Sequence, residues 1–182
     1  MEQKNQLAII SQKKYLQNIS NPISKGFKLD VLKMNMDKLV LFTLEAKPPS
    51  LYSQFKHEEE RTIDLISLMI IEFQDFYNCK GKMNKAQIVE TSYLICQQFR
   101  HFNFYDIGLC FKGAKMNHKV YDRIDGGMIM EWLTLHDINR TGLIVTEREK
   151  AKAQQNAEWS ALGARSSVKS IKDYLKNGSR RT

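Results

Sequence analysis

The chain has 182 residues, of which 42% are hydrophobic and 26% are charged, and it contains only nine glycines and three prolines. That length is enough for one domain with extensions at its ends, and the scarcity of glycine and proline favours long helices over many short strands. No apolar run reaches the roughly 18 residues that a membrane span needs, so we expect no membrane-spanning segment.

The formal net charge of +8 is concentrated near the C-terminal end. Residues 148–182 contain nine Lys or Arg and three Asp or Glu, which gives +6 there and leaves +2 for residues 1–147. A basic extension typically contacts a polyanion or keeps a protein in solution. The first residues show no signal-peptide pattern, so we expect a cytoplasmic protein, whose oligomeric state the sequence leaves open.

Residues 1–49 are predicted to form an N-terminal arm. Residues 5–19 have the apolar spacing of a short amphipathic helix. Residues 27–46 leave two alternatives open, because they begin with the alternation of a strand, while their length and lack of glycine favour a helix capped by Asp30. Two consecutive prolines follow and separate the arm from the rest of the chain.

Residues 50–147 are predicted to form the core as a compact helical bundle. The first helix of this bundle, which starts after Ser50, is expected to end at Gly81. The connections between the predicted helices are about two to four residues long, which favours antiparallel or angled neighbours. We therefore predict an all-α fold, followed by a basic, partly mobile helical extension over residues 148–182. Helix starts are indicated by side chains that can accept a hydrogen bond from the backbone, at Ser50, Asn84, Asn103 and Asp125.

No motif typical of an enzyme is found. The sequence contains none of the serine-hydrolase, zinc-protease, P-loop or dinucleotide-binding patterns, and its four histidines are scattered. The three cysteines, Cys79, Cys96 and Cys110, form no C-x-x-C pair, so we expect them to be reduced and mostly buried. We predict no enzymatic activity and no cofactor.

Three acidic residues near the start of the fourth bundle helix form a candidate site for a divalent cation: Asp122, Asp125 and Glu131. Such sites need several oxygen ligands that converge on the ion. In the simpler interpretation, which we favour, Asp125 caps the helix and Asp122 offsets the charge of Arg123. We therefore predict no metal site.

Cations and aromatic residues alternate between the third and fourth bundle helices. Lysine and arginine side chains in such a connector can hold phosphates, and Tyr121 can stack on a base. A solvated, lysine-rich loop is the alternative. The C-terminal extension supplies a second set of cations. The residues predicted to bind nucleic acid are Lys112, Lys115, Lys119, Tyr121, Arg123, Lys169, Lys172, Lys176, Arg180 and Arg181.

The two tryptophans have different surroundings in the sequence. Trp132 lies on the apolar face of a predicted helix and is expected in the core. Trp159 lies in a polar stretch with Leu162 close by, and an exposed pair of this kind is a candidate docking point for a protein partner. The alternative is that Trp159 folds back onto the bundle.

Residues 85–148 resemble a family of uncharacterised proteins from phages and mobile elements of gut bacteria. Members carry an F-K-x-A-K segment, then Y-D-x-I-D-G and a helix with Trp-Leu. The residues that match here are Phe111, Lys112, Ala114, Lys115, Tyr121, Asp122, Ile124, Asp125, Gly126, Trp132 and Leu133.

The resemblance implies a mobile-element origin and an accessory role in DNA replication, like that of a helicase loader, and it favours DNA over RNA. Together with the charge pattern, it leads us to predict a non-enzymatic, nucleic-acid-associated accessory protein. The alternative is a protein-interaction module that binds and modulates a host or viral protein.

Overall fold

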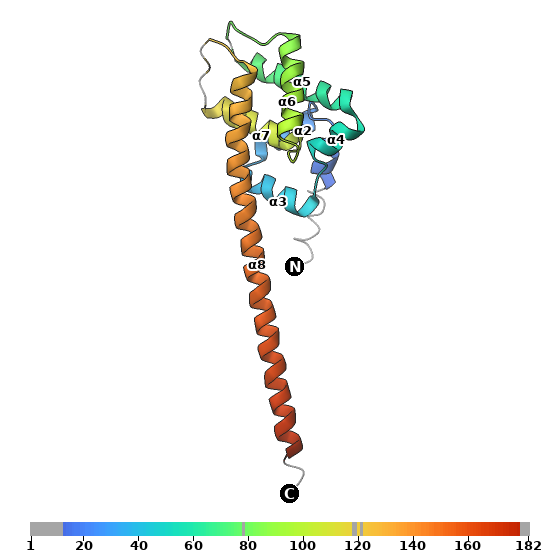
Figure 1. Cartoon of the computed structure of the whole chain (residues 1–182), viewed down its shortest axis with the longest axis vertical. Coiled ribbons are helices and arrows are strands. Elements are labelled where there is room, and N and C mark those ends of the chain that lie inside the picture. Colours follow the sequence, from blue (N-terminus) through green and yellow to red (C-terminus); the bar gives the residue numbers. More distant parts are fainter. Residues whose placement is uncertain (1–12, 78, 118–119, 121, 179–182) are drawn as a thin grey trace. The chain divides into compact units, whose positions relative to one another are not determined.

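The computed structural model describes residues 13–77, 79–117, 120 and 122–178, with side chains described as far as Ser160. The described chain is α-helical almost throughout, which confirms the predicted all-α fold (Figure 1). Residues 13–19 are helical. The helices that follow are α2 (Lys25–Lys33), α3 (Met36–Ala46), α4 (Leu51–His57), α5 (Glu59–Phe76), α6 (Lys85–Gln98), α7 (Phe104–Asn117) and α8 (Gly126–Gly178).

Contacts divide the chain into two compact units, Met1–Thr141 and Gly142–Thr182. We call the first unit the body and the second the extension. Helix α8 runs through the division, so its first part belongs to the body and its remainder to the extension. The sequence placed this boundary after residue 147. The predicted mobility of the C-terminal residues stays a prediction.

Residues 25–46 are helical, which confirms the favoured helix over the strand, but they form two helices and neither is capped by Asp30. Helix α2 begins after Ser24, whose Oγ accepts a hydrogen bond from Phe27 N at 3.1 Å. Helix α3 begins after Asn35, whose side chain accepts from Lys38 N at 3.0 Å. Asp30 is buried instead, where its carboxylate accepts hydrogen bonds from Asn18 and from the Tyr105 hydroxyl.

Helices α2 and α3 are part of the body's hydrophobic core and not a separate arm. Phe27 stacks on Tyr105 of α7 with ring centroids 4.6 Å apart. Gly108 of α7 allows this close approach, because a Cβ there would lie 2.8 Å from Val31 Cγ2. A side chain at Gly108 would therefore push α2 away from α7.

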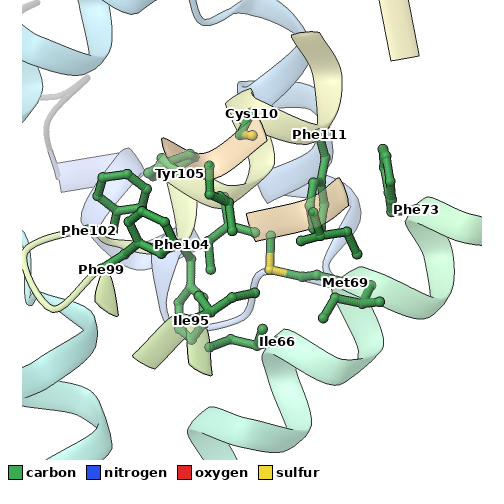
Figure 2. Packing of buried hydrophobic residues seen from close by; sticks show 14 of the residues in the cluster. Ile66, Met69, Phe73, Ile95, Phe99, Phe102, Phe104, Tyr105, Cys110 and Phe111 are labelled. Atoms are coloured by element: carbon green, nitrogen blue, oxygen red, sulfur yellow. The ribbon is translucent and has the colours of Figure 1, made fainter. Parts of the chain in front are cut away.

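Aromatic side chains from α5 and α7 lie in the centre of the body (Figure 2), and Trp132 of α8 packs against them. Phe73 of α5 stacks on Phe111 of α7 with centroids 4.3 Å apart, and its edge contacts Trp132 of α8 at 5.6 Å. Trp132 is buried, as predicted. Burial of one large apolar side chain contributes about 1.5–3 kcal/mol, so this cluster is a main source of stability.

The predicted helix starts at Ser50, Asn84, Asn103 and Asp125 are confirmed by hydrogen bonds. Ser50 Oγ accepts from Ser53 N at 3.2 Å. Asn84 and Gln87 form a reciprocal capping box, with distances of 3.0 and 2.9 Å. Asn103, which precedes α7, accepts a hydrogen bond from Tyr105 N at 2.8 Å. Asp125 Oδ1 accepts from Met128 N at 3.0 Å. Each cap is local in sequence, which is why the pattern revealed it.

The prediction that Gly81 ends a helix was wrong, because α5 already ends at Phe76. It forms a parallel bridge with Arg123, in which Gly81 N donates to Asp122 O and Ile124 N donates to Gly81 O, both at 2.9 Å. A Cβ at Gly81 would lie 2.7 Å from Arg123 Cβ, so the bridge requires glycine.

Among the described residues, none of the helices combines the length and the apolarity needed to cross a bilayer.

Candidate functional site

Lys112 is a structural residue of the body. It lies on α7, and its Nζ donates hydrogen bonds to Leu32 O and Met34 O, both at 2.8 Å. These carbonyls belong to the last turn and the C-cap of α2, where a cation also interacts favourably with the helix dipole. Two of the three donors of this ammonium are therefore used within the fold.

Lys115 is also on α7, one turn later, and it faces aromatic rings. Its Nζ lies 4.9 Å from the ring centroid of Phe76 and 5.7 Å from that of Phe73. Burial lowers the pKa of Lys115, and the nearby Glu72 opposes that change in part. The expected basic loop therefore begins later than predicted, because both lysines lie on a helix.

Arg123 is the exposed one among the described members of the predicted connector site. Its side chain is 75% exposed, and its Nε lies 3.2 Å from Asp125 Oδ2. The sequence had Asp122 offset the charge of Arg123, but the ion pair described for Arg123 is with Asp125, whose predicted capping role is confirmed. Lys119 and Tyr121 lie outside the described residues. The structure thus does not bring the connector cations together as one described cluster.

The acidic residues near this corner do not form a described metal site. Within the part of the chain that the structure describes, no three His, Cys, Asp or Glu side chains are placed to hold a metal ion. Asp125 is engaged by the α8 backbone and by Arg123.

The extension carries its cations on one helix. Helix α8 includes residues 165, 169, 172 and 176, which are Arg165, Lys169, Lys172 and Lys176. Successive intervals of four, three and four residues keep these positions on one side of an α-helix. The first of them was not among the predicted binding residues, although the spacing alone was a usable signal. Arg180 and Arg181 lie outside the described residues.

Trp159 of the extension is 69% exposed, so the described structure does not place it against a core. The side chain of its predicted neighbour, Leu162, lies outside the described residues.

A buried charged cluster in the body was missed by the sequence reasoning. Asp106 of α7 lies 2.6 Å from Arg140 Nε and 3.5 Å from His136 Nε2, both on α8. All three side chains are almost fully buried. Asp106 also accepts a hydrogen bond from Asn103 N at 2.8 Å. The one available signal was the spacing of four residues between His136 and Arg140, which places both on the same face of a helix.

This cluster joins two helices and is also lined by aromatic rings. The Arg140 guanidinium lies 5.5 Å from the ring centroid of Phe102, and the His136 ring contacts the same phenyl group edge-on at 5.5 Å. Next to it, His101 Nε2 lies 2.7 Å from Asp137 Oδ1. The whole arrangement fixes the third and fourth turns of α8 against the start of α7, which is a structural role.

A cavity of about 430 Å³ opens between α2, α5 and α7. Its walls include the buried side chains of Phe27, Met69 and Phe111. Lys112 and Lys115 also line it, so the two predicted nucleic-acid-binding lysines of α7 border an apolar cavity.

The three cysteines are free and buried, as predicted. Burial raises the pKa of the thiols of Cys96 and Cys110 to about 12 in each case. Buried thiols with such a pKa are poor nucleophiles, because the thiolate is the reactive form.

Comparisons of the chain with protein-family models, with curated proteins and with solved structures found no match.

Proposed function

We propose that this protein is a nucleic-acid-associated accessory protein that contacts the phosphate backbone through its extension. The observation that carries the proposal is the recurrence of four cations, at residues 165, 169, 172 and 176, on one side of α8. These positions span about 16 Å along the helix axis at 1.5 Å per residue. Duplex DNA carries a charge about every 1.7 Å, so a row of this length can meet several phosphates.

The division of charge between the two units supports this assignment. Residues 142–182 contain nine Lys or Arg and four Asp or Glu, so the extension carries +5 of the total charge of +8 and the body +3. In the body, Lys112 is hydrogen-bonded to α2 and Lys115 lies over two phenyl rings, so neither is poised to reach a phosphate without leaving its contacts. The sequence predicted contacts from both the connector and the extension, and the proposal keeps those of the extension.

An accessory role in the DNA replication of a phage or mobile element, like that of a helicase loader, remains part of the proposal. It rests on the resemblance of residues 85–148 to proteins of such elements. The same resemblance is the reason for preferring DNA to RNA.

The test is binding to single-stranded DNA, duplex DNA and RNA over a salt series, with the full-length protein and a variant in which Arg165, Lys169, Lys172 and Lys176 are all changed to Gln. We expect binding to weaken steeply with salt. Each phosphate contact contributes about 0.9 to the slope of log K against log salt on duplex DNA, so the variant should lose about 3 to 4 from that slope.

A variant with the same loss of charge in the body is the matched control. Lys25, Lys33, Lys56 and Lys85 are exposed, and their change to Gln removes four positive charges from the body. This control should retain most of the salt slope. Equal losses in the two variants would show a response to net charge alone, and no binding by the wild type at any salt concentration would contradict the proposal.

A protein-interaction module is the second candidate, and the 69% exposure of Trp159 is the observation that favours it. Interface tryptophans often carry a large share of the binding energy. A protein that ignores nucleic acid in the series above, but self-associates or captures a protein partner in a manner that depends on Trp159, would support this candidate.

A further inference from the structure

The cavity between α2, α5 and α7 has the size and lining of a small-molecule site. Its volume of about 430 Å³ lies within the roughly 300–1,000 Å³ that such sites occupy. The inner wall is apolar and fixed by packing, because Phe27, Phe73 and Phe111 are each buried in the core (Figure 2 shows Phe73 and Phe111).

The outer edge of the cavity is apolar and exposed to solvent. Leu32, Phe76 and Met116 line it and are 65%, 59% and 73% exposed. Three large apolar side chains around one opening expose surface that a bound apolar group would remove from water.

The charged groups that line the cavity are not balanced. They are three lysines and one glutamate, a surplus of two positive charges. Lys28 pairs with Glu72 at 2.6 Å, and Lys112 donates two hydrogen bonds to carbonyl oxygens of α2 and its cap. The glutamate is thus already engaged, and the third lysine, Lys115, has no carboxylate partner within 4 Å among the described residues.

We propose that the cavity binds a small amphiphilic acid, with an aliphatic or aromatic body against Phe73 and Phe111 and a single carboxylate against Lys115 Nζ. The surplus of positive charge selects an anion, and the apolar wall selects a hydrocarbon body. A carboxylate at Lys115 would also offset the burial that lowers the pKa of this ammonium. The proposed ligand site lies in the body, so it is independent of nucleic-acid binding by the extension.

The test uses three probes with the same ten-carbon chain: decanoate, decanol and decylammonium. Their affinities for the full-length protein are measured by calorimetry below micelle-forming concentrations. Because a hydrogen bond to a charged partner is stronger than a neutral one, decanoate should bind about tenfold more tightly than decanol. Decylammonium should bind more weakly than both.

The location of the bound decanoate is measured by NMR, from the signals of the methionine methyl groups. Met69 and Met116 line the cavity, whereas Met83 is buried without lining it. Decanoate should shift the first two signals and leave the third unchanged.

The contribution of the Lys115 ammonium to the preference for an anion is tested with Lys115→Met, which keeps a long side chain over the phenyl rings and removes the positive charge. This variant should lose the preference for decanoate over decanol, while its affinity for decanol stays the same. Lys56→Met, at an exposed position outside the cavity, is the matched control and should behave as the wild type.

Four results would overturn the proposal. The first two are equal affinity of the wild type for decanoate and decanol, and saturation with decanoate without NMR shifts at Met69 and Met116. The third is an unchanged preference of Lys115→Met for decanoate over decanol. The fourth is a set of shifts at these methionines that a leucine-terminated peptide causes and decanoate does not. The wild-type probe series stands by itself if Lys115→Met does not fold.

Discussion

The body and the extension use charged residues in opposite ways. In the body, Asp106 and Arg140 form a buried ion pair at 2.6 Å that links α7 to α8. In the extension, Glu147 and Lys150 form a pair of nearly the same length, 2.7 Å, but the lysine is largely exposed and both residues lie within one turn of the same helix. The surroundings of a charge, and not its presence or its pair distance, decide what it contributes to stability.

The largest expected effect comes from removal of the buried anion. Asp106→Ala would leave Arg140 buried without its carboxylate, so we expect the free energy of unfolding to fall by about 3–5 kcal/mol. Glu147→Ala in the extension should cost less than about 0.5 kcal/mol, because exposed pairs contribute little. Urea denaturation of both variants measures the difference, and equal losses would remove the distinction between the two units.

A smaller effect is expected from a methyl group added to a glycine. Gly108→Ala places a Cβ 2.8 Å from Val31 Cγ2 and 3.3 Å from Phe27 Cε1, and overpacking of this kind typically costs about 1–3 kcal/mol. Gly142→Ala in the extension meets no atom within 4 Å, so alanine should be neutral or should stabilise the helix by up to about 1 kcal/mol.

A second substitution identifies the atoms responsible for the Gly108 effect. Val31→Ala removes the methyl group that the new Cβ would meet, so the double variant should be more stable than the sum of the two single effects predicts. Thermal or urea unfolding of the four proteins gives the coupling energy. Strict additivity would show that α2 and α7 are not in the contact described.

The third prediction concerns alkaline pH, and it applies to the body because all three cysteines lie there. The pKa of Cys96 and that of Cys110 are about 12 in the folded protein, above the ordinary thiol value of about 9. Below pH 9 both thiols are protonated in the folded and unfolded states. As the pH rises from about 9 to 12, the unfolded state loses these protons first, so the stability falls by about 1.4 kcal/mol per pH unit for each thiol.

Urea midpoints measured between pH 8 and pH 11 test this slope. Cys96→Ala should remove the contribution of one thiol, so the free energy of unfolding should depend less steeply on pH. Lost packing should also lower this free energy by the same amount at every pH. A variant with the same slope as the wild type would show that the thiol ionises equally in both states.

The sequence predicted features that depend on neighbours along the chain. The caps at Asn84 and Asp125 were found because the accepting side chain and the donating backbone are three residues apart. Asp30 was misassigned as a cap because its partners, Asn18 and Tyr105, lie on other elements. Gly81 was misassigned for the same reason, since its partner is Arg123.

The candidate sites were harder to predict than the helices, because a cation is defined by what surrounds it. Lys115 and Lys169 look alike in the sequence. The first is covered by phenyl rings that α5 supplies, and no local pattern announces that packing. The second is assigned to the proposed phosphate contact through helical spacing, a property of α8 alone.

The bridge between Gly81 and Arg123 also bears on the order of folding. Its two hydrogen bonds join the segments that precede α6 and follow α7, so they close a loop that contains both helices. Closing a long loop costs chain entropy, which short-range helix contacts do not. The bridge should therefore form after the helices α6 and α7 themselves, and protection of the Gly81 and Ile124 amides from hydrogen exchange should appear later than that of the amides within these two helices.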